Sequence, residues 1–94
     1  MEELYDRALM YIDLSSRARE KLSVISPENT HLRRAVDDAL DMVDRYISDS
    51  KHFFDAKDYT RALGAASYAH GWLDCLARMG VIDVGRDSEL FTVD

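Results

Sequence analysis

The sequence is poor in several residue types, and each scarcity narrows what the protein can be. It holds a single cysteine, Cys75, so no internal disulfide can form and the reducing cytoplasm is the expected location. No uncharged apolar run approaches the roughly 18 residues that a membrane span needs, so no association with a membrane is expected. The 12 basic side chains are outnumbered by 18 acidic ones, which gives a net charge of −6. Nucleic-acid binding is therefore not expected, because its affinity comes mainly from Lys and Arg on phosphates.

The length allows one modest domain. At 94 residues the chain is too short for most large enzyme scaffolds, which need roughly 200 residues. Hydrophobic residues make up 47% of the chain and charged residues 32%, with one proline and four glycines. These proportions are typical of a globular chain and not of a disordered one.

Two polar breaks divide the chain into three helices. The first is Ser26-Pro27, where Ser26 can cap a helix and Pro27 suits its first position, because the amide there has no partner. The second is the stretch 55–58, in which Asp58 can cap the next helix, while Gly80 suits a left-handed helix end. We therefore predict helices over residues 3–24, 27–54 and 59–79. Since the connections are short, the prediction is an all-α, up-and-down antiparallel three-helix bundle over residues 1–80, followed by an extended tail over 81–94.

The third predicted helix differs from the first two. Those are amphipathic, with one apolar side for a core, whereas the third is apolar almost all round. An isolated three-helix bundle does not need such a helix, so we expect something to cover its second face: the tail, a second copy of the chain or another protein. The side chains that continue around this far side are the candidate interface residues, because Trp and Tyr anchors are favoured at protein interfaces. They are Tyr68, Trp72 and Met79.

The tail offers two β-prone tetrapeptides. They are residues 81–84 and 90–93, and the turn-rich residues 85–88 separate them. An isolated hairpin is marginal in water, so this one would have to lie on the bundle. The sequence leaves open whether the tail or self-association covers the third helix.

The densest local signal is the segment Tyr68-Ala69-His70-Gly71-Trp72-Leu73-Asp74. His70 and Asp74 are spaced i, i+4, so their side chains can meet, and Gly71 permits close approach of a ligand or a helix. A carboxylate that orients an imidazole suits a binding or catalytic site, and it equally suits a partly buried structural pair. His70, Gly71 and Asp74 are therefore candidate binding residues. No catalytic residue is predicted, because a serine inside a helix, such as Ser67, has no free N–H groups beside it to stabilise an oxyanion.

No metal site and no cofactor are predicted. Asp37, Asp41 and Asp44 share one flank of the second helix, a pattern that suits hard cations but is more typical of a solvated acidic face. The zinc patterns H-E-x-x-H and C-x-x-C are absent. Cys75 has apolar neighbours and is predicted to pack as a small hydrophobic side chain.

Small residues form a stripe along the third helix at Gly64, Ser67 and Gly71. Glycine costs a helix interior roughly 1 kcal/mol relative to alanine, so two glycines call for a reason. Close approach of another helix is one such reason. A ligand lying against the backbone is the other.

Several parts of the chain together resemble a family of short archaeal proteins known as domain-of-unknown-function family 357. The resemblance rests on Phe53-Phe54, Asp58-Tyr59, Ala62, the segment 68–74 and Leu90-Phe91-Thr92-Val93. It covers nearly the whole chain and implies an up-and-down three-helix bundle, an archaeal cytoplasmic origin and no assigned activity. The third helix is also similar to the HEPN nucleases and nucleotide-binding modules, which place an Arg shortly before a His. Here eight residues lie between Arg61 and His70, and this spacing, with the charge of −6, argues against an RNase.

Two hypotheses about function follow. In the first, the chain is a small non-catalytic interaction module that self-associates or binds a protein partner through its third helix. In the second, a pocket at His70 and Asp74 binds or transforms a small polar or phosphorylated molecule, with a distant similarity to the HEPN modules.

Overall fold

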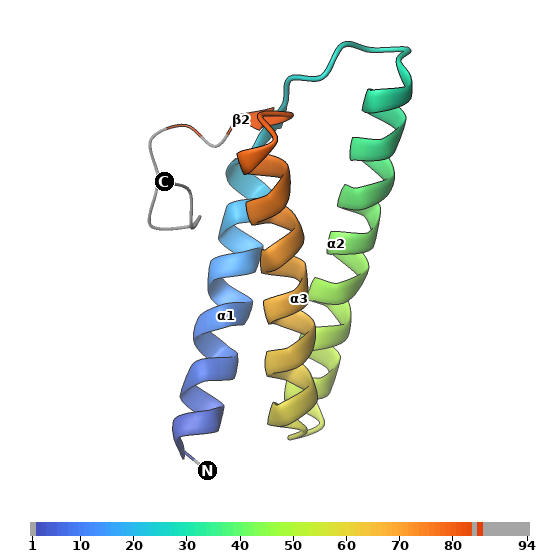
Figure 1. Cartoon of the computed structure of the whole chain (residues 1–94). Coiled ribbons are helices and arrows are strands. Elements are labelled where there is room, and N and C mark those ends of the chain that lie inside the picture. Colours follow the sequence, from blue (N-terminus) through green and yellow to red (C-terminus); the bar gives the residue numbers. More distant parts are fainter. Residues whose placement is uncertain (1, 84, 86–94) are drawn as a thin grey trace.

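The computed structural model describes residues 2–83 and 85 and contains three long helices (Figure 1). Helix α1 spans Glu2–Lys21, α2 spans His31–Asp55 and α3 spans Tyr59–Arg78. Two short strands, β1 at Ser23–Val24 and β2 at Ile82–Asp83, follow α1 and α3. The helices pack closely against one another, so the predicted all-α three-helix bundle is confirmed.

Successive helices run in opposite directions, which makes α1 and α3 parallel. The ring of Tyr5 in α1 lies 5.2 Å from that of Tyr59 at the start of α3, and the ring of Tyr11 lies 6.3 Å from that of His70 further along. Figure 1 shows the N-terminal end of α1 near the turn that joins α2 to α3, and β2 at the opposite end of the bundle.

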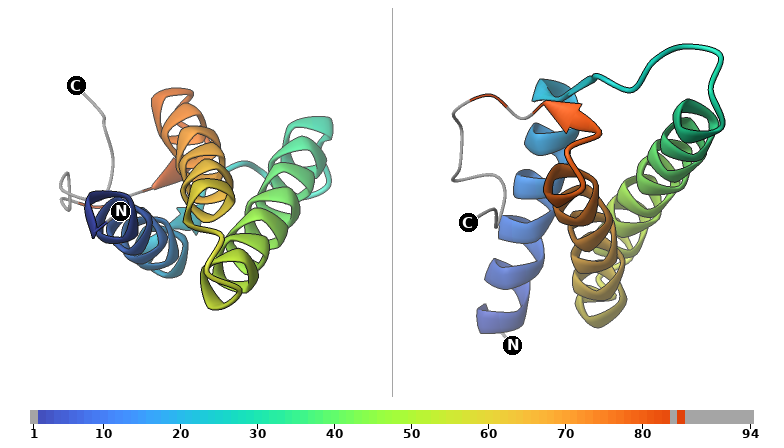
Figure 2. Two further views of the ribbon diagram at one scale, coloured as in Figure 1. Left: turned by 90° about the horizontal axis from the view of Figure 1, so that it is seen from below. Right: turned by 45° about the horizontal axis from the view of Figure 1, so that its top comes forward.

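Helix α3 is the central helix of the bundle. It packs against both α1 and α2, whereas these two make few contacts with each other (Figure 2). The chain itself therefore covers two sides of α3, and close packing is possible because Ala62, Ala66 and Ala69 are fully buried. The side that carries Tyr68, Trp72 and Met79 is not covered by α1 or α2, since Tyr68 and Met79 are exposed, so its cover by a further element stays a prediction.

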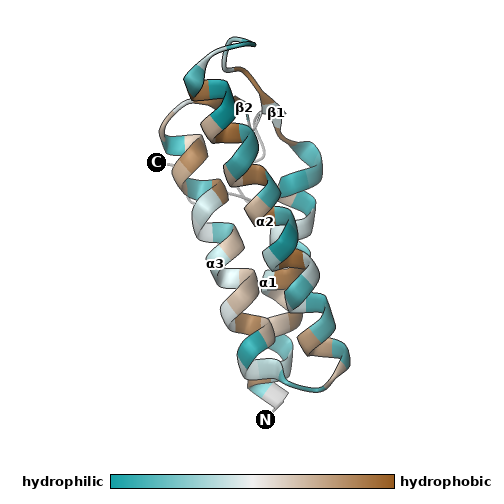
Figure 3. Cartoon of the chain, turned by 90° about the vertical axis from the view of Figure 1, so that its right-hand side faces the viewer, coloured by the Kyte–Doolittle hydropathy of each residue, from teal (hydrophilic) through white to brown (hydrophobic). Residues whose placement is uncertain are grey.

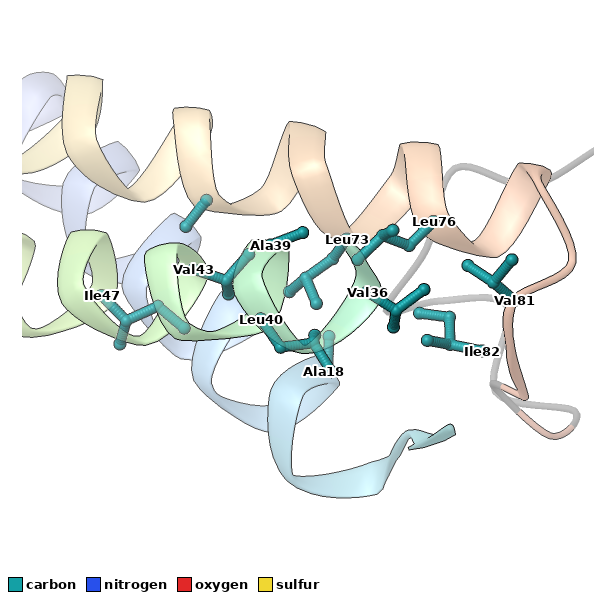
Figure 4. Close-up of a cluster of buried hydrophobic side chains, with 11 residues drawn as sticks. Ala18, Val36, Ala39, Leu40, Val43, Ile47, Leu73, Leu76, Val81 and Ile82 are labelled. Atoms are coloured by element: carbon teal, nitrogen blue, oxygen red, sulfur yellow. The ribbon is translucent and has the colours of Figure 1, made fainter. Parts of the chain in front are cut away.

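The hydrophobic core consists of two clusters along α3. The larger cluster joins α2 to α3 and β2 around Val43 and Leu73, which are fully buried (Figure 4). The smaller cluster brings residues of α1 against α3 and contains Ala8, Ile12, Ala62 and Ala66. One buried hydroxyl also links these helices, since Ser15 donates its Oγ–H to the carbonyl oxygen of Ala66 over 3.0 Å. The core thus fixes how α3 is rotated about its own axis.

Helix α2 begins at His31, four residues later than the sequence predicts. Its N-cap is Thr30, whose side-chain oxygen accepts a hydrogen bond from the amide of Arg33 over 3.0 Å. Ser26 is buried and donates its hydroxyl to the carbonyl oxygen of Val81 over 3.3 Å. The predicted cap at Ser26 is therefore wrong, because this side chain is bonded to the segment that follows α3.

The segments after α1 and after α3 pair with each other. Helix α1 ends at Lys21 and not at residue 24, because β1 forms an antiparallel ladder with β2. Val81 and Ile82 are buried in the larger core cluster, so the start of the tail packs on the bundle. Residues 90–93, the second half of the predicted hairpin, lie outside the described residues.

The outer side of α2 is polar, as the hydrophilic bands along it show (Figure 3). Its acidic flank is ion-paired at short range: Asp37 with Arg33 (3.2 Å), Asp41 with Arg45 (3.0 Å) and Asp44 with Arg19 of α1 (2.8 Å). Within residues 2–83 and 85, no group of three or more His, Cys, Asp or Glu side chains is placed to hold a metal ion. No helix in these ranges has both the length and the apolar run required to cross a membrane.

Candidate functional site

The ends of α3 fix which of its sides faces solvent. Asp58 caps the start, where its carboxylate accepts a hydrogen bond from the amide of Arg61 over 3.2 Å. The helix ends at Arg78, one residue before the predicted end, and Gly80 follows with a φ of +74°. Two sides of the helix between these points contact α1 and α2, and the third side is exposed.

A shallow groove of about 420 Å³ lies on this exposed side. We call it the α3 groove, and its lining residues are Ser67, Tyr68, Gly71, Trp72 and Cys75. The groove forms because Gly71 has no side chain and Ser67 has a short one, while the two aromatic side chains rise beside them. All five lining residues are uncharged, so the groove suits an apolar or small neutral surface.

Other rings hold the aromatic wall of the α3 groove in place. The ring centroids of Tyr68 and Trp72 are 6.5 Å apart, and Tyr46 of α2 lies 4.7 Å from Tyr68. Trp72 also packs against the larger core cluster. Ring pairs at such distances contribute roughly 0.5–1.5 kcal/mol each beyond the area that they bury. The wall is therefore formed before any ligand arrives.

The three candidate interface residues lie along one edge of the α3 groove. Tyr68 is 50% exposed and Met79 is 61% exposed, whereas Trp72 is partly buried. Met79 adjoins the groove through Cys75, whose Sγ lies 3.9 Å from the Met79 Sδ. The structure thus places Tyr68 and Trp72 in the groove and Met79 beside its Cys75 end, and their role in binding stays a prediction.

The two glycines inside α3 are not required by the packing of the described residues. A Cβ atom added at Gly64 or Gly71 would meet no heavy atom within 4 Å. Each glycine nevertheless lowers helix stability by roughly 1 kcal/mol relative to alanine. Both residues are exposed, so the space that they leave opens to the outside of the bundle.

His70 lies toward α1, where its ring meets the ring of Tyr11 at a centroid distance of 6.3 Å. Burial lowers the pKa of His70 below its ordinary value of 6.5, and the negative charge of Asp74 partly opposes this shift. In the described part of the chain, the His70 Nδ1 and the Asp74 Oδ1 are buried without a hydrogen-bond partner. The other carboxylate oxygen, Asp74 Oδ2, lies 3.7 Å from the Nε of Arg78. His70 and Asp74 therefore interact through charge, and the predicted pairing does not satisfy these two buried atoms.

This arrangement provides a buried imidazole nitrogen and a carboxylate oxygen but no activated nucleophile. Ser67 lines the α3 groove in the interior of a helix, where the backbone amides are already bonded and cannot form an oxyanion hole. Gly71 also belongs to the α3 groove. The three candidate binding residues therefore do not line one common site, because Gly71 lies in the groove whereas His70 faces α1.

Sequence reasoning misses two residues of the site. The prediction that Cys75 packs as a small hydrophobic side chain is wrong, because this cysteine is exposed and lines the α3 groove. The signal was its i, i+4 spacing from Gly71, which places both on one side of the helix. Tyr11 had no signal, because its contact with His70 joins two helices that are distant in sequence.

Comparison with protein families finds a match over residues 10–82 to the family described as "Protein of unknown function (DUF357)". The chain belongs to this family. The DUF357 match runs from within α1 to β2, so it includes all of α2 and α3, and with α3 the groove, His70 and Asp74. No curated protein and no solved structure matches the chain. The description of DUF357 assigns no activity, so the function has to be argued from the geometry of the site.

Proposed function

We propose that this chain is a small non-catalytic interaction module that binds an α-helix of a protein in the α3 groove. One observation carries the proposal: an uncharged groove of about 420 Å³, with an aromatic wall, lies open on the central helix. Its lining residues run from Ser67 to Cys75, which is about two helical turns. Grooves of this type recognise helices through a few apolar anchors spaced one turn apart.

Tyr68 is the strongest anchor for such a partner. Tyr and Trp bury much surface at little cost in conformational entropy, which is why they dominate protein interfaces. Half of the Tyr68 surface is exposed, although Tyr46 and Trp72 already hold its ring. A partner that covers Tyr68 therefore gains contact area without having to order a mobile side chain.

A photo-crosslinking amino acid at Ser67 tests this proposal inside cells. The matched control carries the same amino acid at Ser48, which is exposed on α2. We expect protein adducts from position 67 and not from position 48, and we expect Tyr68→Ala to reduce their yield. Tyr68→Ala is preferred to Trp72→Ala because Trp72 also packs against the core. Equal adducts at both positions, or none at either, would contradict the proposal.

A second candidate function rests on the two buried atoms that have no hydrogen-bond partner, His70 Nδ1 and Asp74 Oδ1. Such atoms are rare in proteins and are often completed by a bound molecule. The alternative is therefore that His70 and Asp74 hold a small polar or phosphorylated molecule. NMR titration of His70 with and without inorganic phosphate discriminates the two functions. A His70 pKa that rises with phosphate supports the alternative, and an unchanged pKa indicates a structural residue.

A reducing compartment, such as the cytoplasm, is part of the same proposal. The support is Cys75, which is exposed and is the only cysteine of the chain, so it cannot be protected in an internal disulfide. Cell fractionation followed by thiol labelling tests this location. Recovery of the chain from an oxidising compartment would contradict it.

A further inference from the structure

Small and large side chains alternate symmetrically along the exposed side of α3, from the turn before the α3 groove to the end of the groove. The small residues are Gly64, Ser67, Gly71 and Cys75, and the large ones among them are Tyr68 and Trp72. The pattern is symmetric about the midpoint between residues 69 and 70. Each large side chain has a small one at its mirror position, since Tyr68 mirrors Gly71 and Trp72 mirrors Ser67. The outer small residues, Gly64 and Cys75, mirror each other.

We infer that the helix bound in the α3 groove is α3 of a second copy of this chain, packed antiparallel about a two-fold axis at that midpoint. This inference rests on the proposed function, because it names the occupant of the same groove. In a two-fold dimer each contact occurs twice, so Tyr68 of each copy lies over Gly71 of the other. This large side chain set against a small one lets the two helices pack closely. Trp72 lies at the flank of the contact, on the same side as Trp72 of the other copy. The second copy then fills the open space at Gly64 and Gly71.

Charge favours this face when two copies of an acidic chain meet. The net charge of −6 makes the copies repel each other through most of their surfaces. Helix α2 has six acidic and four basic side chains, whereas α3 has one acidic and two basic ones. The α3 groove itself is uncharged. Repulsion between the copies is therefore weakest where their α3 helices meet.

The basic residues near the ends of the groove are compatible with this arrangement. The two-fold axis places Arg61 of one copy opposite Arg78 of the other. Each arginine has a carboxylate of its own chain nearby, Asp58 at 3.5 Å from Arg61 and Asp74 at 3.7 Å from Arg78. Two acid–base pairs therefore meet at each end of the contact, and no uncompensated like charges face each other.

The area of the contact sets its expected strength. Helix α3 has 20 residues and is thus about 30 Å long. A contact strip about 10 Å wide along it covers roughly 300 Å² per copy. Standard stable interfaces bury about 800 Å² per partner. A dimer held by α3 is therefore weak, and its fraction rises with protein concentration.

A designed disulfide between the copies tests this geometry. The variant Gly64→Cys keeps the native Cys75, and the two-fold axis places position 64 of one copy opposite Cys75 of the other. Gentle oxidation is expected to convert most of this variant into a covalent dimer of twice 10.8 kDa. Within one chain the same two positions are separated along α3 by about 16 Å, beyond the limit of about 7 Å between Cα atoms for a disulfide. The two native Cys75 residues of the dimer are just as far apart, so the wild type is expected to stay mainly monomeric.

Two controls complete the experiment. Ser48→Cys adds the same number of thiols at an exposed position of α2 and is expected to give little covalent dimer. Circular dichroism checks that Gly64→Cys is folded, which is expected because an added Cβ there meets no heavy atom within 4 Å. Equal dimer yields from Gly64→Cys and Ser48→Cys overturn the inference. A covalent dimer as the main species of the oxidised wild type also overturns it.

The photo-crosslinking experiment at Ser67 separates failure of this inference from failure of the proposed function. Adducts with a different protein, combined with no disulfide dimer in Gly64→Cys, leave the proposed function standing and overturn the second copy as the occupant. No adducts at all, combined with a monomer at every concentration in sedimentation, overturn both. Adducts of twice the chain mass together with the disulfide dimer support both.

Discussion

Replacing either glycine inside α3 by alanine is expected to stabilise the isolated chain. Gly64 and Gly71 lie away from the helix ends, and an added Cβ at either meets no heavy atom within 4 Å. The substitution therefore brings the difference in helix propensity, about 1 kcal/mol, without a packing penalty. In a domain of this size, about 1 kcal/mol raises the melting temperature by roughly 4–8 °C. The two positions are about 10 Å apart along the helix, so the double variant is expected to gain about 2 kcal/mol.

Urea unfolding followed by circular dichroism measures this gain, at a low concentration where a weak dimer has dissociated. Gly80→Ala is the matched control. An added Cβ at Gly80 also meets open space, but its φ of +74° strains any L side chain, so we expect a loss of about 1 kcal/mol. A loss of stability in Gly64→Ala or Gly71→Ala would refute the reasoning, and so would a gain in Gly80→Ala.

Three further predictions concern stability. Burial holds the pKa of His70 in the folded chain below 6.5, so the unfolded chain takes up a proton first and stability is lost as the pH falls from 6.5 through the folded pKa. Urea unfolding near neutral pH and at about pH 5 should therefore show a smaller loss of stability in His70→Gln than in the wild type. An equal loss in both would assign the effect to other groups. Thr30→Ala removes the cap of α2 and is expected to lower the free energy of unfolding by about 1 kcal/mol, whereas the control Ser26→Ala is expected to leave that cap intact. An unchanged rate of amide exchange at Arg33 in Thr30→Ala would contradict the role of Thr30 as the cap. Leu73→Ala empties a fully buried position and is expected to cost roughly 2–5 kcal/mol in thermal or urea unfolding, and a cost below about 1 kcal/mol would place Leu73 outside the core.

The helices can be predicted from the sequence where their boundaries carry one local signal. Asp58 and Gly80 mark the ends of α3 because a cap and a left-handed residue are properties of single positions. The start of α2 has two competing signals, Ser26-Pro27 and Thr30. The hydrogen bond from Ser26 to the carbonyl of Val81, 55 residues away, decides between them. No local pattern contains that information.

The candidate site can be predicted only in part, for a similar reason. Periodicity places Tyr68 and Trp72 on a side of α3 outside its main core stripe, and the structure shows them in the α3 groove. However, a helix that is apolar almost all round can be the central helix of its own bundle or can bind an external partner. Only the packing of α1 and α2 on α3 shows which of its sides the chain itself covers. The spacing from His70 to Asp74 also equals that from Asp74 to Arg78, so the sequence does not decide which neighbour the carboxylate faces.

The position of α1 has a consequence for how the chain opens. Its attachment to α3 depends on contacts such as the hydrogen bond from Ser15 to Ala66, which joins residues 51 positions apart. The short turn between α2 and α3 brings those two helices together at little loop-closure entropy, whereas a longer connection separates α1 from α2 and α1 docks mainly on α3. We therefore expect detachment of α1 to be the opening of lowest free energy, and amide hydrogen exchange to be faster in α1 than in α2 and α3. Such an opening exposes Ala62 and Ala66, which the closed bundle buries, so a partner that competes with α1 has a second route to α3.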